Sequence, residues 1–254
     1  MMTVLKSFAS AFLMYSRIPM PVVEWKEENK RYALCFFPLI GVVIGALIYL
    51  AFLGCDYLGL SGNFFGAVAL CIPIIVTGGI HIDGFMDVND AKACLGDKEK
   101  KLSVMKDSRV GAFAVIHICL YMILFFAAFT QLGDEEAVMC SGFIFVISRA
   151  LSGLGAVTFK SATGMGSLTS FTKPAHKAVT IVTEILYVIV CTAAMMCINP
   201  YIGAGVTVVA LLTFVYYRIF AYRTFGGITG DVAGYFLQLC ELFCVLTVLI
   251  TGAV

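Results

Sequence analysis

The sequence predicts an all-α, polytopic integral membrane protein, and three observations support this fold class. The 254 residues are 61% hydrophobic and only 13% charged, with a mean hydropathy of +0.97, which leaves too little polar surface for a soluble domain. Seven apolar stretches are long enough for a helix to cross a bilayer, which takes roughly 20 residues. Lys and Arg gather in one set of connecting segments. We interpret residues 1–254 as a single membrane domain.

The first element, residues 3–16, is a short apolar stretch followed by Arg17, prolines and further charges. It lacks the small-residue cleavage site of a signal peptide and is too short to span. We therefore expect an amphipathic or re-entrant helix on the cytoplasmic face. The transmembrane helices then follow in order, with expected bounds 33–54, 64–80, 111–132, 137–157, 178–198, 201–220 and 233–252.

The distribution of charge predicts how these spans are oriented. Threading them alternately places 1–32, 81–110, 158–177 and 221–232 on one side of the membrane. All 17 Lys and Arg then lie in these segments or at the adjoining span ends, whereas the opposite loops carry Asp56, Asp134, Glu135 and Glu136. By the positive-inside rule the basic side is cytoplasmic. We expect a multi-pass protein of the cell (inner) membrane, with its N-terminus inside and its C-terminus on the opposite side.

Residues 78–111 gather acids and bases between two apolar stretches. Asp83, Asp87 and Asp90 stand at i, i+4 and i+7, a spacing that places them on one face of a helix. Carboxylates so close to a membrane repel one another, and oxygen ligands favour Mg²⁺ or Mn²⁺, so we expect a divalent cation there. The alternative is a solvated loop, whose acids are balanced by Lys98, Lys100, Lys101 and Lys106.

The basic residues of this segment suggest a phosphate-bearing substrate. Lys106 and Arg109 are three residues apart, so both can grip phosphates from one helix face. Acids for a metal and bases for phosphate together indicate phosphoryl transfer. His81 stays open between a metal ligand, a phosphate donor and a packed interfacial side chain. The ten cysteines include no C-x-x-C pair, so neither a disulfide framework nor a zinc site is indicated.

These motifs resemble those of a known family. "GGIHIDGFMDVNDA" and "MKDSRVGAFAV" are similar to the H-x-D-G-x-x-D-x-x-D and M-K-D-S-R-x-G signatures of the cobalamin synthase (adenosylcobinamide-GDP ribazoletransferase) family. "YSRIP", "FFPLIG", "ISRAL" and "GGITGDVAG" follow the order expected of it. The resemblance implies a membrane-bound, Mg²⁺-dependent enzyme late in cobalamin biosynthesis. Such an enzyme joins α-ribazole, or its 5'-phosphate, to adenosylcobinamide-GDP and releases GMP.

The resemblance and the chemistry together suggest roles for individual residues. Asp83, Asp87 and Asp90 would hold one or two metal ions on the pyrophosphate, and Asp90 could double as general base. Lys106 and Arg109 would hold the departing GMP phosphate. Asp107 and Asp231 are further candidate metal ligands. Weaker candidates for substrate binding are His81, Arg17, Arg149 and Arg223, although the arginines could equally anchor helix ends at lipid headgroups.

Two other classes of protein share some of these features. A CDP-alcohol phosphotransferase has a D-G-x-x-A-R motif that begins like Asp83-Gly84, but here Asp87-Val88 replaces its Ala-Arg pair. An ion-coupled transporter would carry acids in mid-span, whereas Glu184 and Glu241 fall near the ends of spans. The expected partners are the two small-molecule substrates and the lipid bilayer, with no nucleic acid. Association into a homo-oligomer stays open.

Overall fold

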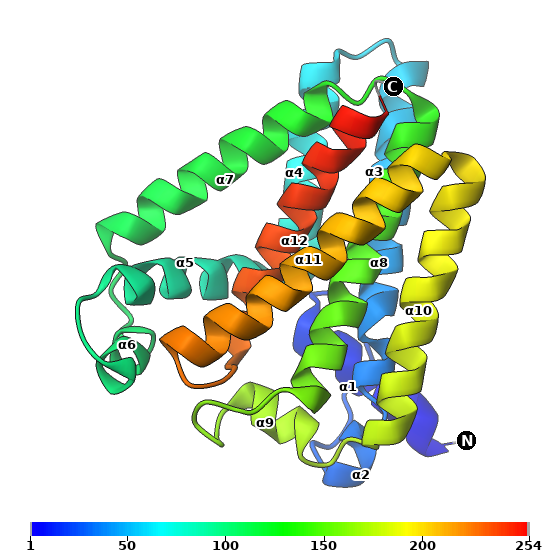
Figure 1. Ribbon diagram of the computed structural model, residues 1–254. Coiled ribbons are helices and arrows are strands. Elements are labelled where there is room, and N and C mark those ends of the chain that lie inside the picture. The colour runs from blue at the N-terminus through cyan, green and yellow to red at the C-terminus, as the bar shows by residue number, and fades with distance from the viewer. Residues whose placement is uncertain (1, 253–254) are drawn as a thin grey trace.

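A computed structural model of the chain describes residues 2–252 as a bundle of helices (Figure 1). Within that range there is no strand, and the only extended pairing is an isolated bridge between Ser161 and Ile228. The prediction of an all-α, polytopic helical membrane protein is confirmed.

The helices match the expected spans to within four residues at either end. In chain order they are α1 (Met2–Tyr15), α2 (Glu27–Lys30), the 3₁₀ turn η1 (Leu34–Phe36), α3 (Phe37–Tyr57), α4 (Gly62–Thr77), α5 (Ile80–Ala93), α6 (Lys98–Val104), α7 (Ala112–Thr130), α8 (Glu135–Thr158), α9 (Ser167–Thr172), α10 (Lys177–Ile198), α11 (Pro200–Thr224) and α12 (Gly230–Thr251). The expected N-terminal helix is therefore present as α1.

The second expected span differs from the others. Among the described residues, six helices are long and apolar enough to cross a membrane, and α4 joins them only together with α5, to which it is bent by 94°. The bend is made by Gly78 and Gly79, whose φ values of 66° and 80° suit glycine because it has no Cβ. We take α4 as the span. Helix α5 then turns aside and runs outward to the start of α7 (Figure 1).

The connections alternate between two ends of the bundle. The α3–α4, α7–α8 and α10–α11 connections lie at one end, together with the end of α12, whereas α1, α2 and α9 lie at the other (Figure 1). The chain just after the C-terminus of α1 is attached to α4, because the Arg17 backbone N–H donates to the Val76 carbonyl at 2.7 Å. The start of α1 and the end of α12 therefore lie at opposite ends of the molecule.

Helices α8 and α12 form the centre of the bundle, and α7, α10 and α11 form its periphery. The central pair is joined by a buried ion pair in which Arg149 Nη1 lies 2.8 Å from Glu241 Oε1. Charges inside an apolar bundle are costly unless they are paired, which explains why the two occur together. The outer helices expose apolar side chains such as Val182, Ile189 and Leu212, as contact with lipid requires.

The one-sided distribution of Lys and Arg predicts which end of the bundle faces the cytoplasm. Single cysteines at Asp56 and at Lys98, in a background without the native cysteines, should react differently with a membrane-impermeant thiol reagent added to intact cells. We expect labelling at position 56 and none at position 98 until the cells are opened. Labelling of position 98 from outside intact cells would reverse the orientation.

Candidate active site

The candidate site forms where α5 crosses the start of α12. A Cβ added to Gly84 would lie 2.7 Å from the Cα of Asp231, and one added to Gly234 would lie 2.9 Å from the carbonyl oxygen of His81. These distances are shorter than a side chain tolerates, so the two helices pack backbone against backbone at two glycines. The crossing brings the first turn of α5, with Asp83, beside the first turn of α12, with Asp231.

Three of the predicted carboxylates share this crossing. Asp83 is exposed, and Asp87 and Asp231 are half-buried. Burial, followed by the charges of Asp83, Asp231 and Asp90, raises the pKa of Asp87 to about 7. An upward shift from neighbouring acids means that these carboxylates feel one another's charge. Because residues 80–93 form one helix, the predicted stripe lies on one face of α5, and Asp231 of α12 extends it.

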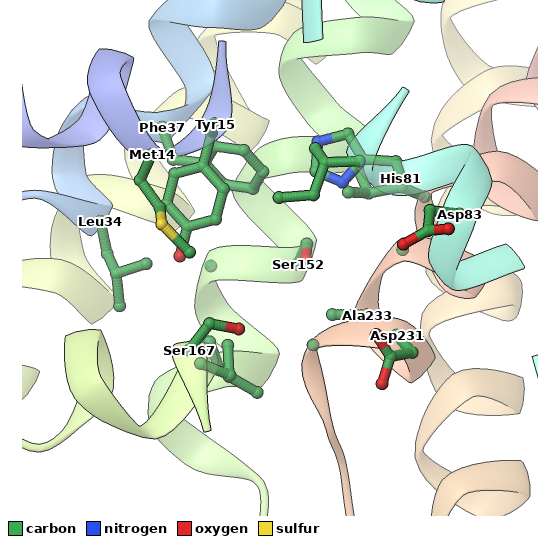
Figure 2. A pocket seen from close by; sticks show the side chains of 17 residues that line it. Met14, Tyr15, Leu34, Phe37, His81, Asp83, Ser152, Ser167, Asp231 and Ala233 are labelled. Carbon is green, nitrogen blue, oxygen red and sulfur yellow. The ribbon is translucent and has the colours of Figure 1, made fainter. Parts of the chain in front are cut away.

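Two cavities meet at Asp83. The first has a volume of about 80 Å³, with Asp83 and Asp231 on one side and Tyr15 and Leu34 on the opposite side (Figure 2). The second is more open, has a volume of about 510 Å³, and is lined by Arg17 and Asp83 among others. One carboxylate thus faces both spaces.

Local hydrogen bonds hold the start of α12 in place. The Ile228 N–H donates to the Lys160 carbonyl at 2.8 Å, and the Ala162 N–H donates to the Ile228 carbonyl at 2.9 Å. Thr229 then caps the helix, since its hydroxyl accepts from the Val232 N–H at 3.2 Å. The connection that carries "GGITGDVAG" is therefore tied to the segment between α8 and α9.

His81 is buried at the edge of the first cavity, and its ring lies 5.9 Å from that of Phe37, centroid to centroid. Burial, followed by the charge of Arg149, lowers the pKa of His81 to about 3. The imidazole is therefore neutral and does not offer a positive charge to a phosphate, and its Nε2 is buried without a hydrogen-bond partner. These surroundings count against the phosphate donor and are compatible with both a packed histidine and a metal ligand.

Asp90 has a different environment from the rest of the stripe. Its Oδ2 accepts a hydrogen bond from the Gly111 N–H at 2.6 Å, and its Oδ1 accepts one from the Ala114 N–H at 2.8 Å. Both oxygens thus cap the N-terminus of α7, where a negative charge is favoured by the helix dipole. The structure gives Asp90 a positioning role, joining α5 to α7, and because each of its oxygens already accepts a hydrogen bond, Asp90 is less available as a general base or metal ligand than Asp83.

Lys106, Asp107 and Arg109 lie in the exposed connection between α6 and α7. Arg109 Nη2 lies 2.6 Å from Asp107 Oδ2, and these hydrogen bonds to Arg109 hold the pKa of Asp107 at about 2. Neither cavity is lined by these three residues. These three residues come after α5 in the chain, near the end of α5 that carries Asp90. Asp90 is about 10 Å along the helix axis from Asp83. Asp107 is therefore not brought into the acidic cluster.

The three arginines that were weaker candidates have three different environments. Arg17 lines the second cavity together with Asp83. Arg149 is 1% exposed and paired with Glu241, so it is part of the core and not a surface for phosphate. Arg223 is exposed in the last turn of α11 and lines neither cavity. Only Arg17 is brought to the site.

The carboxylates can be compared with the needs of a divalent cation. Within residues 2–252 no three His, Cys, Asp or Glu side chains come close enough to form a ready-made metal cage. Mg²⁺ does not need such a cage, because it usually keeps several waters and binds through one or two carboxylates plus substrate phosphates. Asp83, Asp87 and Asp231 supply the hard oxygen donors that it prefers, and their mutual repulsion is the kind that a cation relieves.

The structure adds residues that were not expected from the sequence. Tyr15, Phe37, Ser152 and Ser167 line the first cavity, and half-buried Lys92 of α5 places its Nζ 3.5 Å from the Tyr235 hydroxyl. Tyr15 and Phe37 belong to the motifs "YSRIP" and "FFPLIG", from which the sequence indicated only Arg17 as a candidate. Apolar and aromatic residues in such segments are otherwise indistinguishable from core residues.

The fold and the site define a class: a polytopic helical membrane protein with a carboxylate-lined cavity beside a sharp helix bend. Within this class, the chain belongs to the family described as cobalamin-5-phosphate synthase, which matches residues 7–249.

Relatives of this family are similar over nearly their whole length. A protein of Lachnoclostridium phytofermentans is 41% identical over 250 residues, covering 98% of this chain and 95% of the relative. A protein of Clostridium perfringens is 35% identical over 243 residues, covering 95% and 96%. Both are named adenosylcobinamide-GDP ribazoletransferase. No solved structure matches the chain.

The raised pKa of Asp87 predicts a gain in stability when its charge is removed. In the folded protein this pKa is about 7, above that of an unfolded chain, so ionised Asp87 costs stability increasingly as the pH rises from 4 to 7. In EDTA at pH 8 we expect Asp87→Asn to raise the Tm by about 2 to 4 °C, which is the scale of roughly 1 kcal/mol. The gain should shrink as the pH falls below 7. A gain that is the same at pH 5 and pH 8 would contradict the electrostatic cause.

The capping role of Asp90 predicts the opposite response. Asp90→Ala removes two hydrogen bonds at the start of α7, so we expect the free energy of unfolding in EDTA to fall by about 1 to 2 kcal/mol. Asp97→Ala is the matched control, because Asp97 caps the short, exposed α6 through Lys100 N–H and should cost less. Thermal unfolding in detergent measures both. If the stability of Asp90→Ala is unchanged or increased, the capping role is wrong and Asp90 belongs with the mutually repelling carboxylates Asp83, Asp87 and Asp231.

Proposed function

We propose that the chain joins adenosylcobinamide-GDP to α-ribazole, or to its 5'-phosphate, and releases GMP at the acidic cluster of α5 and α12. The family and the names of the relatives support this late step of cobalamin biosynthesis. The single structural observation that supports the site is that Asp83 lines two neighbouring cavities. A transfer between two substrates needs such a carboxylate where the substrates meet.

The reaction forms one bond and breaks one bond at the same phosphorus. A ribose hydroxyl of α-ribazole, or of α-ribazole 5'-phosphate, loses its proton and attacks the phosphorus next to cobinamide, and the bond from that phosphorus to the oxygen of the departing GMP breaks. Catalysis of such a transfer is mainly positioning and neutralisation of charge. Because Asp90 is engaged in capping α7, Asp83 is the carboxylate best placed to take the proton from an attacking hydroxyl. Arg17, beside Asp83, is placed to bind an oxygen of the pyrophosphate.

Mg²⁺, or Mn²⁺, would be held by Asp87 and Asp231 and would supply positive charge to the pyrophosphate. The chain's own contribution is the rigid crossing at Gly84 and Gly234, which fixes these carboxylates relative to each other. We place this rim on the cytoplasmic side of the cell (inner) membrane, where Lys and Arg gather. Lys106 and Arg109, in the exposed connection before α7, are then candidates to contact the departing GMP.

Transport is less well supported. Contrary to the expectation from the sequence, Glu241 lies in the middle of α12, but it is held in the ion pair with Arg149. Among the described residues this leaves Glu184 of α10 as the one buried acid without a hydrogen-bond partner. A proton or ion relay across the bundle would need free acids along its length.

The proposed reaction predicts a product that can be measured directly. Purified protein in detergent, given adenosylcobinamide-GDP, α-ribazole and Mg²⁺, should release GMP and form a cobamide in equal amounts. Asp83→Asn and Asp231→Asn should each lower kcat by at least about 100-fold, because the amide keeps the size of the side chain but loses its charge. The variants should stay folded and membrane-inserted.

Two controls make this test specific. Asp97→Asn changes an exposed aspartate at the start of α6 and should keep normal turnover. Omission of the divalent metal should abolish turnover of the wild type. Absence of both GMP and cobamide in several detergents, with either Mg²⁺ or Mn²⁺, would overturn the proposed function.

A further inference from the structure

The first cavity, between α1, α3, α8 and α12, has a chemistry that the acidic cluster alone does not explain. We propose that it is the subsite for the aromatic base of the acceptor, the benzimidazole of α-ribazole, with the ribose directed toward Asp83 and Asp231. This inference rests on the proposed function and names the substrate that occupies one part of the same site.

The first cavity is much the narrower of the two. Its volume is about 80 Å³, against about 510 Å³ for the second. A corrin macrocycle with its side chains is far larger than the first cavity. Adenosylcobinamide must therefore stay outside it, on the more open side of Asp83.

The wall opposite the acids is aromatic and apolar. The rings of Tyr15 and Phe37 lie 4.5 Å apart, centroid to centroid, and Leu34 lies on the same side of the cavity. Figure 2 shows Tyr15, Phe37 and Leu34 across the cavity from Asp83 and Asp231. An aromatic base with its ribose therefore has an apolar surface at one end and carboxylates at the other.

The same wall distinguishes between the two bases in the reaction. The base of α-ribazole is dimethylbenzimidazole, whose outer edge carries methyl groups and no hydrogen-bonding atom. Guanine, the base of the GDP half, carries N–H and C=O groups along its edge, and burying them unpaired costs roughly 1 to 3 kcal/mol for each group. Apart from the Tyr15 hydroxyl, the side chains of this wall carry no hydrogen-bonding group, and the carboxylates that could pair with guanine lie across the cavity. The wall therefore suits the methylated base.

The position of Asp83 then separates the two substrates. The acceptor's ribose comes from the first cavity, and the pyrophosphate of adenosylcobinamide-GDP comes from the second cavity, where Arg17 lies. Three residues, Met14, Ile80 and Asp83, line both cavities, so the two substrates meet at the first turn of α5. The acceptor hydroxyl and the pyrophosphate then approach each other from opposite sides of Asp83.

Narrowing the first cavity tests this assignment. Ala156 is 8% exposed and lines the cavity from α8, so Ala156→Leu places a larger side chain where the base should lie. We expect the KM for α-ribazole to rise about 10- to 200-fold, the scale on which hydrophobic pockets discriminate size. The KM for adenosylcobinamide-GDP and the inhibition constant of GMP should stay within about twofold of wild type. Ala193→Leu, on the exposed face of α10, is the matched control and should change neither constant.

Two further measurements keep the test decisive. Free dimethylbenzimidazole should inhibit the wild type competitively against α-ribazole, and this inhibition should be lost in Ala156→Leu. If Ala156→Leu does not fold, Leu168→Ala enlarges the same cavity and should raise kcat/KM for a nucleoside with a bulkier aromatic base relative to that for α-ribazole.

The outcomes separate this inference from the proposed function. A wild type that forms neither GMP nor cobamide removes the proposed function and this inference with it. If the wild type turns over normally and Ala156→Leu, or Leu168→Ala in its place, has unchanged kinetics for the acceptor, only the subsite assignment is overturned. A loss of GMP affinity in Ala156→Leu, with an unchanged KM for α-ribazole, would assign the cavity to guanine and also overturn it.

Discussion

The close crossing of α5 and α12 is the contact on which the candidate site depends. Gly84 and Gly234 leave no room for a Cβ between the two helix backbones, so Asp83 and Asp231 come to lie on the same side of one cavity. The Gly78-Gly79 turn makes this crossing available, because it bends α5 away from α4 by 94°. A continuous helix through residues 62–93 would carry the aspartates along the membrane normal, away from α12.

This crossing also concentrates negative charge, and the rest of the molecule limits its cost in different ways. Asp90 is neutralised by the N-terminus of α7, and Asp107 by Arg109. In the core, Glu241 is neutralised by Arg149. Asp83, Asp87 and Asp231 have no such cation among their contacts, which is why burial and neighbouring acids raise the pKa of Asp87. These three are the acids that we propose to hold a metal ion on the pyrophosphate, since a cation would relieve their repulsion.

The two cavities give the acidic cluster two chemically different sides. On one side of Asp83 the walls are aromatic and apolar, and on the other side the space is open and contains Arg17. An acceptor base and a pyrophosphate differ in the same way, one being flat and apolar and the other charged. The start of α5, which carries Asp83, separates the two cavities, and in the proposed reaction the transferred phosphoryl group lies at this boundary.

The sequence by itself determined the membrane class, the order and approximate bounds of the spans, the acidic stripe of α5 and the family, because hydrophobic length, charge asymmetry and contiguous motifs are local properties. Only the tertiary structure decided which motif residues meet. It joined Asp231 to Asp83 across about 150 residues of chain, engaged Asp90 with α7, placed Arg149 in the core and left Asp107 paired with Arg109. It also turned Tyr15 and Phe37 into the wall of a cavity. The spacing of residues along a helix fixes only the face on which they lie, whereas their partners depend on how that helix packs against others.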